Sequence, residues 1–192
     1  MTGGAARPDR RDAGPLVWNV AGLLGEGVGS QRDYAFADVE IDPGEGVSLA
    51  EPVSGKVRLG RTNRGLLIDG EFHTVLATEC SRCLRPMTVP LDLELHDEAL
   101  PAIDLHTGAP VTISQEDEEA GVLRLTDHHE LDLEPAIREA ILLNEPIAPL
   151  DRDDCPGLCI VCGLPLDEGT HDHPDDDIDP RLEALKAFRP TE

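Results

Sequence analysis

Aromatic residues are scarce in this chain of 192 residues, in which Phe, Trp and Tyr together make up 3%. There is one tryptophan, Trp18, and one tyrosine, Tyr34. The chain is nevertheless long enough for one domain with a buried core. Because 40% of the residues are hydrophobic, that core must consist mainly of Val, Leu, Ile and Ala. Such a core would gain stability from a cross-link, for example a bound metal ion.

Basic residues are also few. The chain has 16 Lys and Arg against 39 Asp and Glu, which gives a formal net charge of -23. A surface of this sign repels the phosphate groups of nucleic acids. The charge therefore excludes broad, non-specific binding to nucleic acid and leaves only a local contact with RNA.

Long apolar runs are absent. No stretch approaches the ~18 consecutive apolar residues of a membrane span, and the first residues, MTGGAARPDRRDAG, lack the apolar centre of a secretory signal. We therefore expect a cytoplasmic protein without a membrane partner. In that reducing compartment, the five cysteines are expected to bind metal or to react rather than to form disulfides.

Familiar catalytic motifs are missing as well. The sequence has no phosphate-binding Gly-Lys-Ser loop, no dinucleotide-binding glycine pattern, and no Ser or Cys nucleophile with an identifiable base. We expect a protein that is not an enzyme and that takes no small-molecule substrate.

Hydrophobic and polar residues alternate through the middle of the chain, as they do in strands with one buried face. Strands are predicted over residues 16–20, 34–41, 53–59, 65–79 and 87–95, with a hairpin turn at 61–65. A helix is expected from Asp132, its cap, to Asn144, and a short terminal helix from Asp179 to Pro190. The acidic run at 115–119 is expected to be a solvated loop.

These elements predict an α+β fold. It should contain a mainly antiparallel β-sheet or a partly open barrel with one packed helix, followed by a C-terminal zinc-knuckle segment and a short helix. We expect a disordered leader over residues 1–14, a β-rich core domain over residues 15–150, and the cysteine-containing knuckle segment with the short helix over residues 151–192.

Four of the cysteines form two Cys-x-x-Cys pairs, Cys80 with Cys83 and Cys159 with Cys162. One turn of this kind presents two thiolates to the same metal ion, and zinc favours four such ligands in a tetrahedron. The sequence therefore favours one structural zinc ion bound by all four residues. The ion would close a loop much longer than the ~15–20 residues of a compact zinc ribbon and would restrict the unfolded chain.

Other donors permit a different site. Cys155, Cys159 and Cys162 with either His171 or His173 would make a local site and leave the first pair as free thiols. Five cysteines are too few for two sites of four cysteines each. A third interpretation is redox chemistry at a Cys-x-x-Cys pair, although the first pair precedes a predicted strand rather than the helix of thioredoxin-type folds.

Basic residues gather in two places despite their scarcity. One group falls on the predicted hairpin and the other flanks the first cysteine pair, and together they are Lys56, Arg58, Arg61, Arg64, Arg82 and Arg85. Such a group can contact RNA phosphates or a partner, because screening limits repulsion from charges beyond ~10 Å. The alternative is a solvated hairpin tip that keeps a strand edge from pairing.

Four segments resemble the YceD family, the proteins linked to accumulation of large-subunit ribosomal RNA in bacteria and plastids. They are CSRCLRPM, LDLEPAIREAILLNEPIAPL, CPGLCIVCGLPLD and DPRLEALKAF, in the family's order, and they span roughly Cys80 to Phe188. The chain departs from many relatives by carrying His171-Asp172-His173 where they have a Cys-x-Cys.

The resemblance implies a non-enzymatic factor for large-subunit ribosomal RNA accumulation and ribosome assembly. Its partner would be a ribosomal RNA precursor or a basic ribosomal protein, and the acidic charge favours the protein. An alternative is a thiol-based redox or metal-responsive protein, in which Cys155 or a Cys-x-x-Cys pair reacts. A third is an acidic adaptor for another basic protein.

Overall fold

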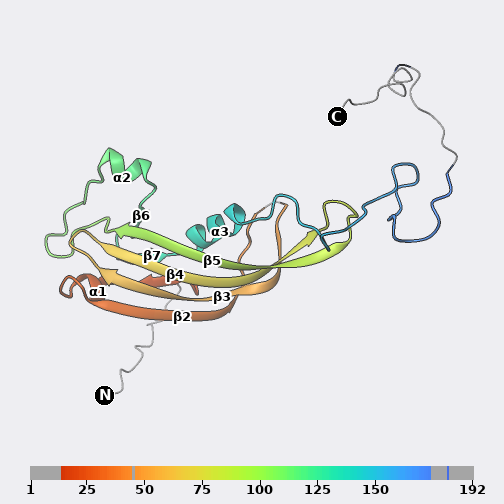
Figure 1. The fold of residues 1–192 in the computed structure, drawn as a ribbon. Helices are drawn as coiled ribbons and strands as arrows, with labels where there is room; N and C mark the ends of the chain where they lie inside the picture. Colours follow the sequence, from red (N-terminus) through yellow and green to blue (C-terminus); the bar gives the residue numbers. More distant parts are fainter. Residues whose placement is uncertain (1–13, 45, 174–180, 182–192) are drawn as a thin grey trace, which may run out of the picture.

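The computed structural model describes residues 14–44, 46–173 and residue 181. Its main element is a five-stranded sheet in the order β2-β3-β4-β5-β6. The strands are β2 (Gln31–Val39), β3 (Ser48–Arg61), β4 (Leu66–Glu79), β5 (Pro86–Leu100) and β6 (Leu123–Arg124). Neighbouring strands are antiparallel except β5 and β6, which are parallel. Figure 1 shows a long, twisted sheet whose edge strands are β2 and β6, so the predicted sheet is confirmed as open and is not a barrel.

Alternation of side chains gives this sheet one buried and one exposed face. In β4, Leu66, Ile68 and Phe72 are buried, whereas Asp69 and Glu71 between them are exposed. The predicted hairpin is confirmed, since β3 and β4 pair from Arg61 opposite Leu66 onwards. Alternation determines which face each residue occupies, because successive side chains of a strand point to opposite faces.

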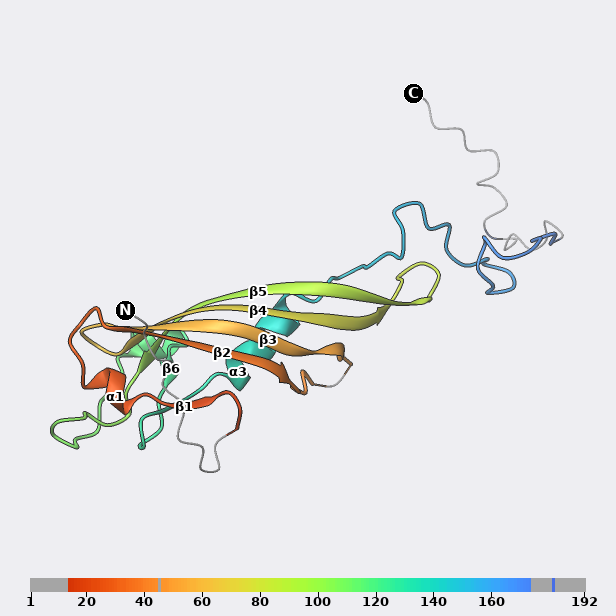
Figure 2. The ribbon, with the colours of Figure 1, turned by 90° about the horizontal axis from the view of Figure 1, so that it is seen from below.

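A second layer covers the buried face. It contains a two-stranded antiparallel sheet of β1 (Val17–Asn19) and β7 (Glu130–Asp132) and the helices α1 (Ala21–Leu24) and α3 (Glu134–Leu143). The helix α3 packs on the sheet (Figures 1 and 2) through buried Ala136, Ile137 and Ile141. Trp18 stacks on Tyr34 with ring centroids 4.7 Å apart. Phe72 is also buried and Phe36 packs against the core, and the other large core side chains are aliphatic, as the composition required.

Two helices differ from the prediction. The acidic run expected to be a loop forms the exposed helix α2 (Gln115–Glu119), because Ser114 caps it by accepting a hydrogen bond from the Asp117 backbone N–H at 3.1 Å. Acidic side chains in a first turn also suit the helix dipole. The short helix α1 was not predicted, whereas α3 is confirmed with Pro135 in its first turn.

Two predicted segments fall outside the described residues. They are the leader over 1–14, apart from Gly14, and the terminal helix from Asp179 to Pro190, apart from residue 181. Among the described residues, no helix has the length and apolar character needed to cross a membrane.

The segment after α3 runs past the end of the sheet where β4 turns into β5 (Figures 1 and 2). The Ser81 backbone N–H in that turn donates a hydrogen bond of 2.8 Å to the Pro149 carbonyl. This contact brings the two cysteine-bearing parts of the chain side by side.

Candidate metal centres

The turn between β4 and β5 is a cysteine knuckle. The Cys80 backbone N–H donates to the Arg85 carbonyl, and the Leu84 N–H donates to the Cys80 carbonyl, each at 2.9 Å. Leu84 takes a φ of 57°, a left-handed conformation that is uncommon for a side chain of its size. The turn therefore carries Cys80 and Cys83 together, and both are buried.

The segment after α3 supplies two more donors to this knuckle. Cys80 Sγ lies 3.7 Å from Cys155 Sγ and 3.3 Å from Asp151 Oδ1. The donor atoms of Cys80, Cys83, Cys155 and Asp151 all lie within 4.8 Å of one another. We call these four residues the hairpin cluster. Three thiols and a carboxylate at this spacing fit a tetrahedral zinc ion.

Hydrogen bonds and hydrophobic packing hold the hairpin cluster together. Arg82 Nη1 donates a hydrogen bond of 2.9 Å to the Cys155 carbonyl, in addition to the bond from Ser81 to Pro149. Met87, Leu150 and Leu158 pack against the buried cysteines. These contacts within the protein hold the four donors close together without a metal ion.

The two central thiols differ in acidity. Burial acts to raise the pKa of Cys80, but backbone N–H groups, that of Asp151 first, outweigh it and lower the pKa to about 7. Burial and the neighbouring Asp151 carboxylate raise the pKa of Cys155 to about 12. A divalent cation would counter the second effect, because it favours the deprotonated form of a coordinating thiol.

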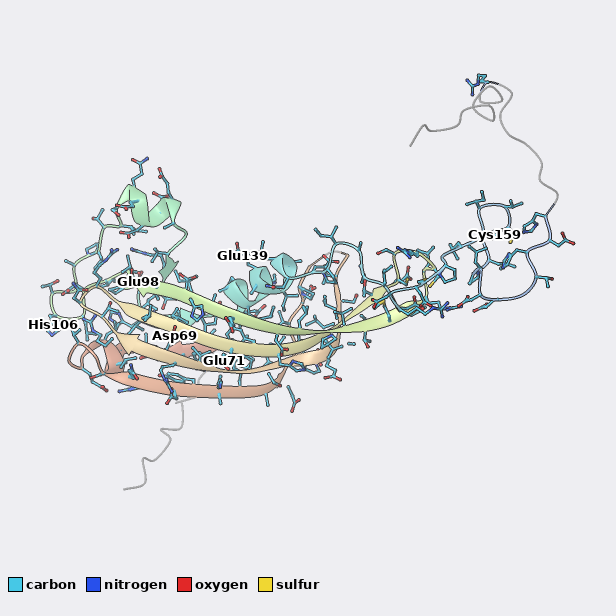
Figure 3. The ribbon with its side chains drawn as sticks, viewed as in Figure 1. Asp69, Glu71, Glu98, His106, Glu139 and Cys159 are labelled. Atoms are coloured by element: carbon cyan, nitrogen blue, oxygen red, sulfur yellow. The ribbon has the colours of Figure 1, made fainter. Side chains whose placement is uncertain are left out.

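The second Cys-x-x-Cys pair forms a knuckle with the same hydrogen bonds. The Cys159 N–H donates to the Leu164 carbonyl and the Gly163 N–H donates to the Cys159 carbonyl, each at 2.8 Å. Gly163 occupies the position of Leu84 with a φ of 73°, which glycine adopts without strain. Figure 3 shows Cys159 in this loop, beyond the end of the sheet. The chain therefore repeats one turn geometry at both cysteine pairs.

Two histidines complete a second group of donors. The donor atoms of Cys159, Cys162, His171 and His173 lie within 4.8 Å of one another, and we call these residues the terminal cluster. Cys162 Sγ lies 3.5 Å from His171 Nδ1. Hydrogen bonds from the backbone N–H groups of Cys162 and Val161 lower the pKa of Cys159 to about 6.

The structure corrects the predicted grouping of ligands. The four cysteines expected at one zinc ion are divided, with Cys80 and Cys83 in the hairpin cluster and Cys159 and Cys162 in the terminal cluster. The local alternative is divided too, because Cys155 joins the hairpin cluster. Counting cysteines alone left out Asp151, and it allowed for one site where the structure brings together two groups of donors.

A carboxylate joins the two knuckles. Asp167 Oδ2 accepts hydrogen bonds from Arg85 Nη1 at 2.8 Å and from Arg152 Nη2 at 2.6 Å. These two guanidinium groups hold the pKa of Asp167 well below its usual range. Arg85 follows the first knuckle and Asp167 follows the second. This link therefore fastens residues 156–173, which we call the terminal segment, to the turn between β4 and β5.

Replacing Asp167 with asparagine should loosen the terminal segment at neutral pH. A carboxyl whose pKa is lower in the folded state adds stability above its unfolded pKa of about 3.9 and loses that contribution as pH falls. The protection factor of the Leu166 amide, which donates to the Gly157 carbonyl at 2.9 Å, should therefore drop at pH 7 and differ little from the parent at acid pH. Hydrogen exchange measures it.

The matched control is Asp154→Asn, which also removes a partner of Arg152 but from a side chain that is 90% exposed. Its effect on the same amide should be smaller, because exposed ion pairs contribute little. Equal effects of the two variants at pH 7 would show that the link through Asp167 has no special role.

Each of the six basic residues predicted to contact RNA has a partner within the chain. Exposed ion pairs join Lys56 to Glu71 at 2.9 Å and Arg58 to Asp33 at 2.8 Å. Arg61 donates to the Leu24 carbonyl at 3.0 Å. The remaining pairs are Arg64 with Asp117, Arg82 with the Cys155 carbonyl, and Arg85 with Asp167. The structure does not gather these six residues into one unpaired basic surface.

Comparison with known proteins gives a family and several relatives. Residues 68–189 match the family model described as large ribosomal RNA subunit accumulation protein YceD. Uncharacterized proteins of Mycobacterium tuberculosis and Mycobacterium bovis are 34% identical over 186 residues, which is 92% of this chain and 82% of theirs. An uncharacterized protein of Mycobacterium leprae is 33% identical over 137 residues, 70% of this chain and 58% of its own. No solved structure matches. The matched region includes both clusters.

Proposed function

This chain belongs to the YceD family, and on that premise we propose that it is a non-enzymatic factor for large-subunit ribosomal RNA accumulation and ribosome assembly. It holds a structural zinc ion in the hairpin cluster and acts in the cytoplasm, where ribosomes are made. Its direct partner is a basic ribosomal protein.

The observation that carries the structural role is the burial of the hairpin cluster. Cys80, Cys83 and Cys155 are 0%, 5% and 1% exposed and the Asp151 side chain is 19% exposed, so three of the four donors are shielded from water. Structural zinc sites are closed in this way, whereas catalytic sites keep one position open for water or substrate. The ion would tie the segment after α3 to the end of the sheet, and this is a role in shape rather than in chemistry.

The choice of partner rests on charge. The six basic side chains described above are engaged within the chain, so among the described residues they offer phosphate groups no unpaired basic surface. Acidic side chains occupy the exposed face of the sheet, among them Asp69 and Glu71 on β4 (Figure 3) and Asp92 and Glu94 on β5. A negative surface attracts a basic protein and repels RNA.

A second candidate function is thiol-based redox or metal sensing. The lowered pKa values of Cys80 and Cys159 favour it, because thiolates are the reactive form of cysteine. The same lowering also prepares both residues to bind metal. Rapid alkylation of one cysteine in the zinc-loaded protein would favour the redox function, whereas a metal-bound, buried thiolate should react slowly.

Depletion of the protein should lower mature large-subunit ribosomal RNA relative to small-subunit RNA. The wild-type gene should restore the ratio, and a gene with Cys80→Ser and Cys83→Ser should not, because both changes remove ligands of the hairpin cluster. Arg58→Gln is the matched control, since it removes a basic side chain that already pairs with Asp33. Quantitative RNA profiling after depletion measures the ratio.

Two outcomes oppose the proposal. A normal RNA ratio in depleted cells would refute the role in ribosomal RNA accumulation. Failure of Arg58→Gln to restore the ratio would instead favour direct contact between RNA and the hairpin of β3 and β4, which carries Arg58.

A further inference from the structure

We propose that the terminal cluster is a second zinc site, with Cys159, Cys162, His171 and His173 as its four ligands. This inference goes beyond the proposed function, which requires metal only in the hairpin cluster. It rests on the lack of a core in the terminal segment, on the orientation of His171, and on a buried nitrogen of His173.

The terminal segment has almost no hydrophobic core. Between residues 156 and 173, only Gly157 and Cys159 are buried. The two residues between the cysteines are apolar, yet Ile160 is 101% exposed and Val161 is 65% exposed. Hydrophobic burial therefore does not hold this turn, and segments too short for a core are usually stabilised by a disulfide or a metal.

Both cysteines of this turn are free thiols. The turn places Cys159 and Cys162 with two imidazoles, and this combination of two thiols and two imidazoles is a common structural zinc site. Its backbone hydrogen bonds repeat those of the hairpin knuckle, where three thiols and a carboxylate converge. The two turns therefore present their cysteines in the same way.

His171 is oriented as a metal ligand. Its Nε2 lies 2.9 Å from the Pro165 carbonyl, which can only accept a hydrogen bond, so Nε2 must carry the proton. In the neutral ring, Nδ1 then has a free lone pair, and it faces Cys162 Sγ at 3.5 Å. Metal-bound histidines typically donate their other N–H to a carbonyl or carboxylate in this manner.

His173 supplies the fourth donor and an independent observation. Its Nε2 is buried and has no hydrogen-bond partner among the described residues. A buried polar atom without a partner costs about 1–3 kcal/mol, so native proteins rarely leave one in place. A zinc ion at the terminal cluster would give this ring the partner that the protein does not.

Native mass spectrometry of the full chain, purified with zinc present, tests the proposal. The wild type should carry two zinc ions, and the double variant His171→Gln, His173→Gln should carry one. The double variant His73→Gln, His96→Gln is the matched control, because both of these histidines lie on the exposed sheet face in carboxylate pairs. It should retain two ions.

A second measurement identifies the ligands if the variants lose structure. In the cobalt-substituted wild type, absorption bands of tetrahedral cobalt should appear with two equivalents of metal, and the His171, His173 variant should lose one set while its far-UV circular dichroism keeps the sheet signal. The same zinc content in the wild type and in that variant, or a metal other than zinc in the terminal cluster, would overturn the inference. None of these results depends on the role in RNA accumulation.

Discussion

A Cys155→Ser variant should lose the zinc ion of the hairpin cluster and release residues 149–155 from the sheet. Cys155 is 1% exposed and is the one thiol that the segment after α3 contributes to that cluster. Loss of a hydrogen-bond partner of a metal ligand alone lowers metal affinity about 10–100-fold, so loss of a ligand should lower it by more than about 100-fold. Competition with a chelator measures the affinity.

The stability of the segment should fall with the metal. Structural zinc contributes about 10–16 kcal/mol of apparent binding free energy in zinc-finger peptides, and this free energy is available only to the folded arrangement of ligands. Hydrogen exchange at the Ser81 amide, which donates to the Pro149 carbonyl, should therefore accelerate. Asp153→Asn is the control, because this exposed residue lies two positions away and outside the cluster. Unchanged zinc affinity in the Cys155 variant would show that the cluster does not bind metal.

An Ile137→Ala variant should lose about 2–5 kcal/mol of unfolding free energy, the usual result of deleting a large aliphatic side chain from a packed core. Ile137 is 0% exposed and lies on the face of α3 that covers the sheet. Because the core has few aromatic rings, aliphatic contacts of this kind make up most of its stabilising contacts. Chemical denaturation measures the change.

The control for that variant lies on the same helix. Leu143 is 77% exposed, so Leu143→Ala should change the unfolding free energy by less than about 0.5 kcal/mol. Both variants should keep the denaturant dependence of the parent, because neither changes the extent of the fold. Similar losses in the two variants would mean that α3 is not anchored by its buried face.

The sheet could be predicted from the sequence because the alternation of hydrophobic and polar residues is a local property. Met87 through Leu95 alternate without a break, and the structure places them in β5. The parallel pairing of β5 with β6 was not predicted, since it joins Ala99 to Leu123 across a long connection. No local pattern specifies such a contact.

The candidate ligands lie close together in the structure, but in a grouping that the sequence did not indicate. All five cysteines and both histidines named as candidates lie in one of the two clusters. Asp151 was missed because it is one of 39 acidic residues and nothing in its local sequence distinguishes it. Asp151 reaches the hairpin cluster because the segment after α3 contacts the turn between β4 and β5, where the Ser81 N–H donates to the Pro149 carbonyl. This contact depends on the path of the chain after α3.

The partners of the basic residues could not be read from the sequence. Their clustering in the sequence suggested a contact with RNA, but the structure pairs them with groups that are distant in the chain, as with Arg64 and Asp117 or Arg85 and Asp167. In a chain of such negative charge, a basic residue has many carboxylates to meet, and proximity in sequence does not show which side chains remain unpaired.

In the proposed hairpin site, Cys80 and Cys83 share a zinc ion with Cys155 and Asp151 rather than with the second cysteine pair. X-ray absorption of zinc in the His171→Gln, His173→Gln variant tests it most directly, because that variant keeps all five cysteines. We expect the zinc ion of the hairpin cluster to have three sulfur ligands at about 2.3 Å and one oxygen ligand at about 2.0–2.2 Å. Four sulfur ligands would contradict it and would restore the single site of four cysteines.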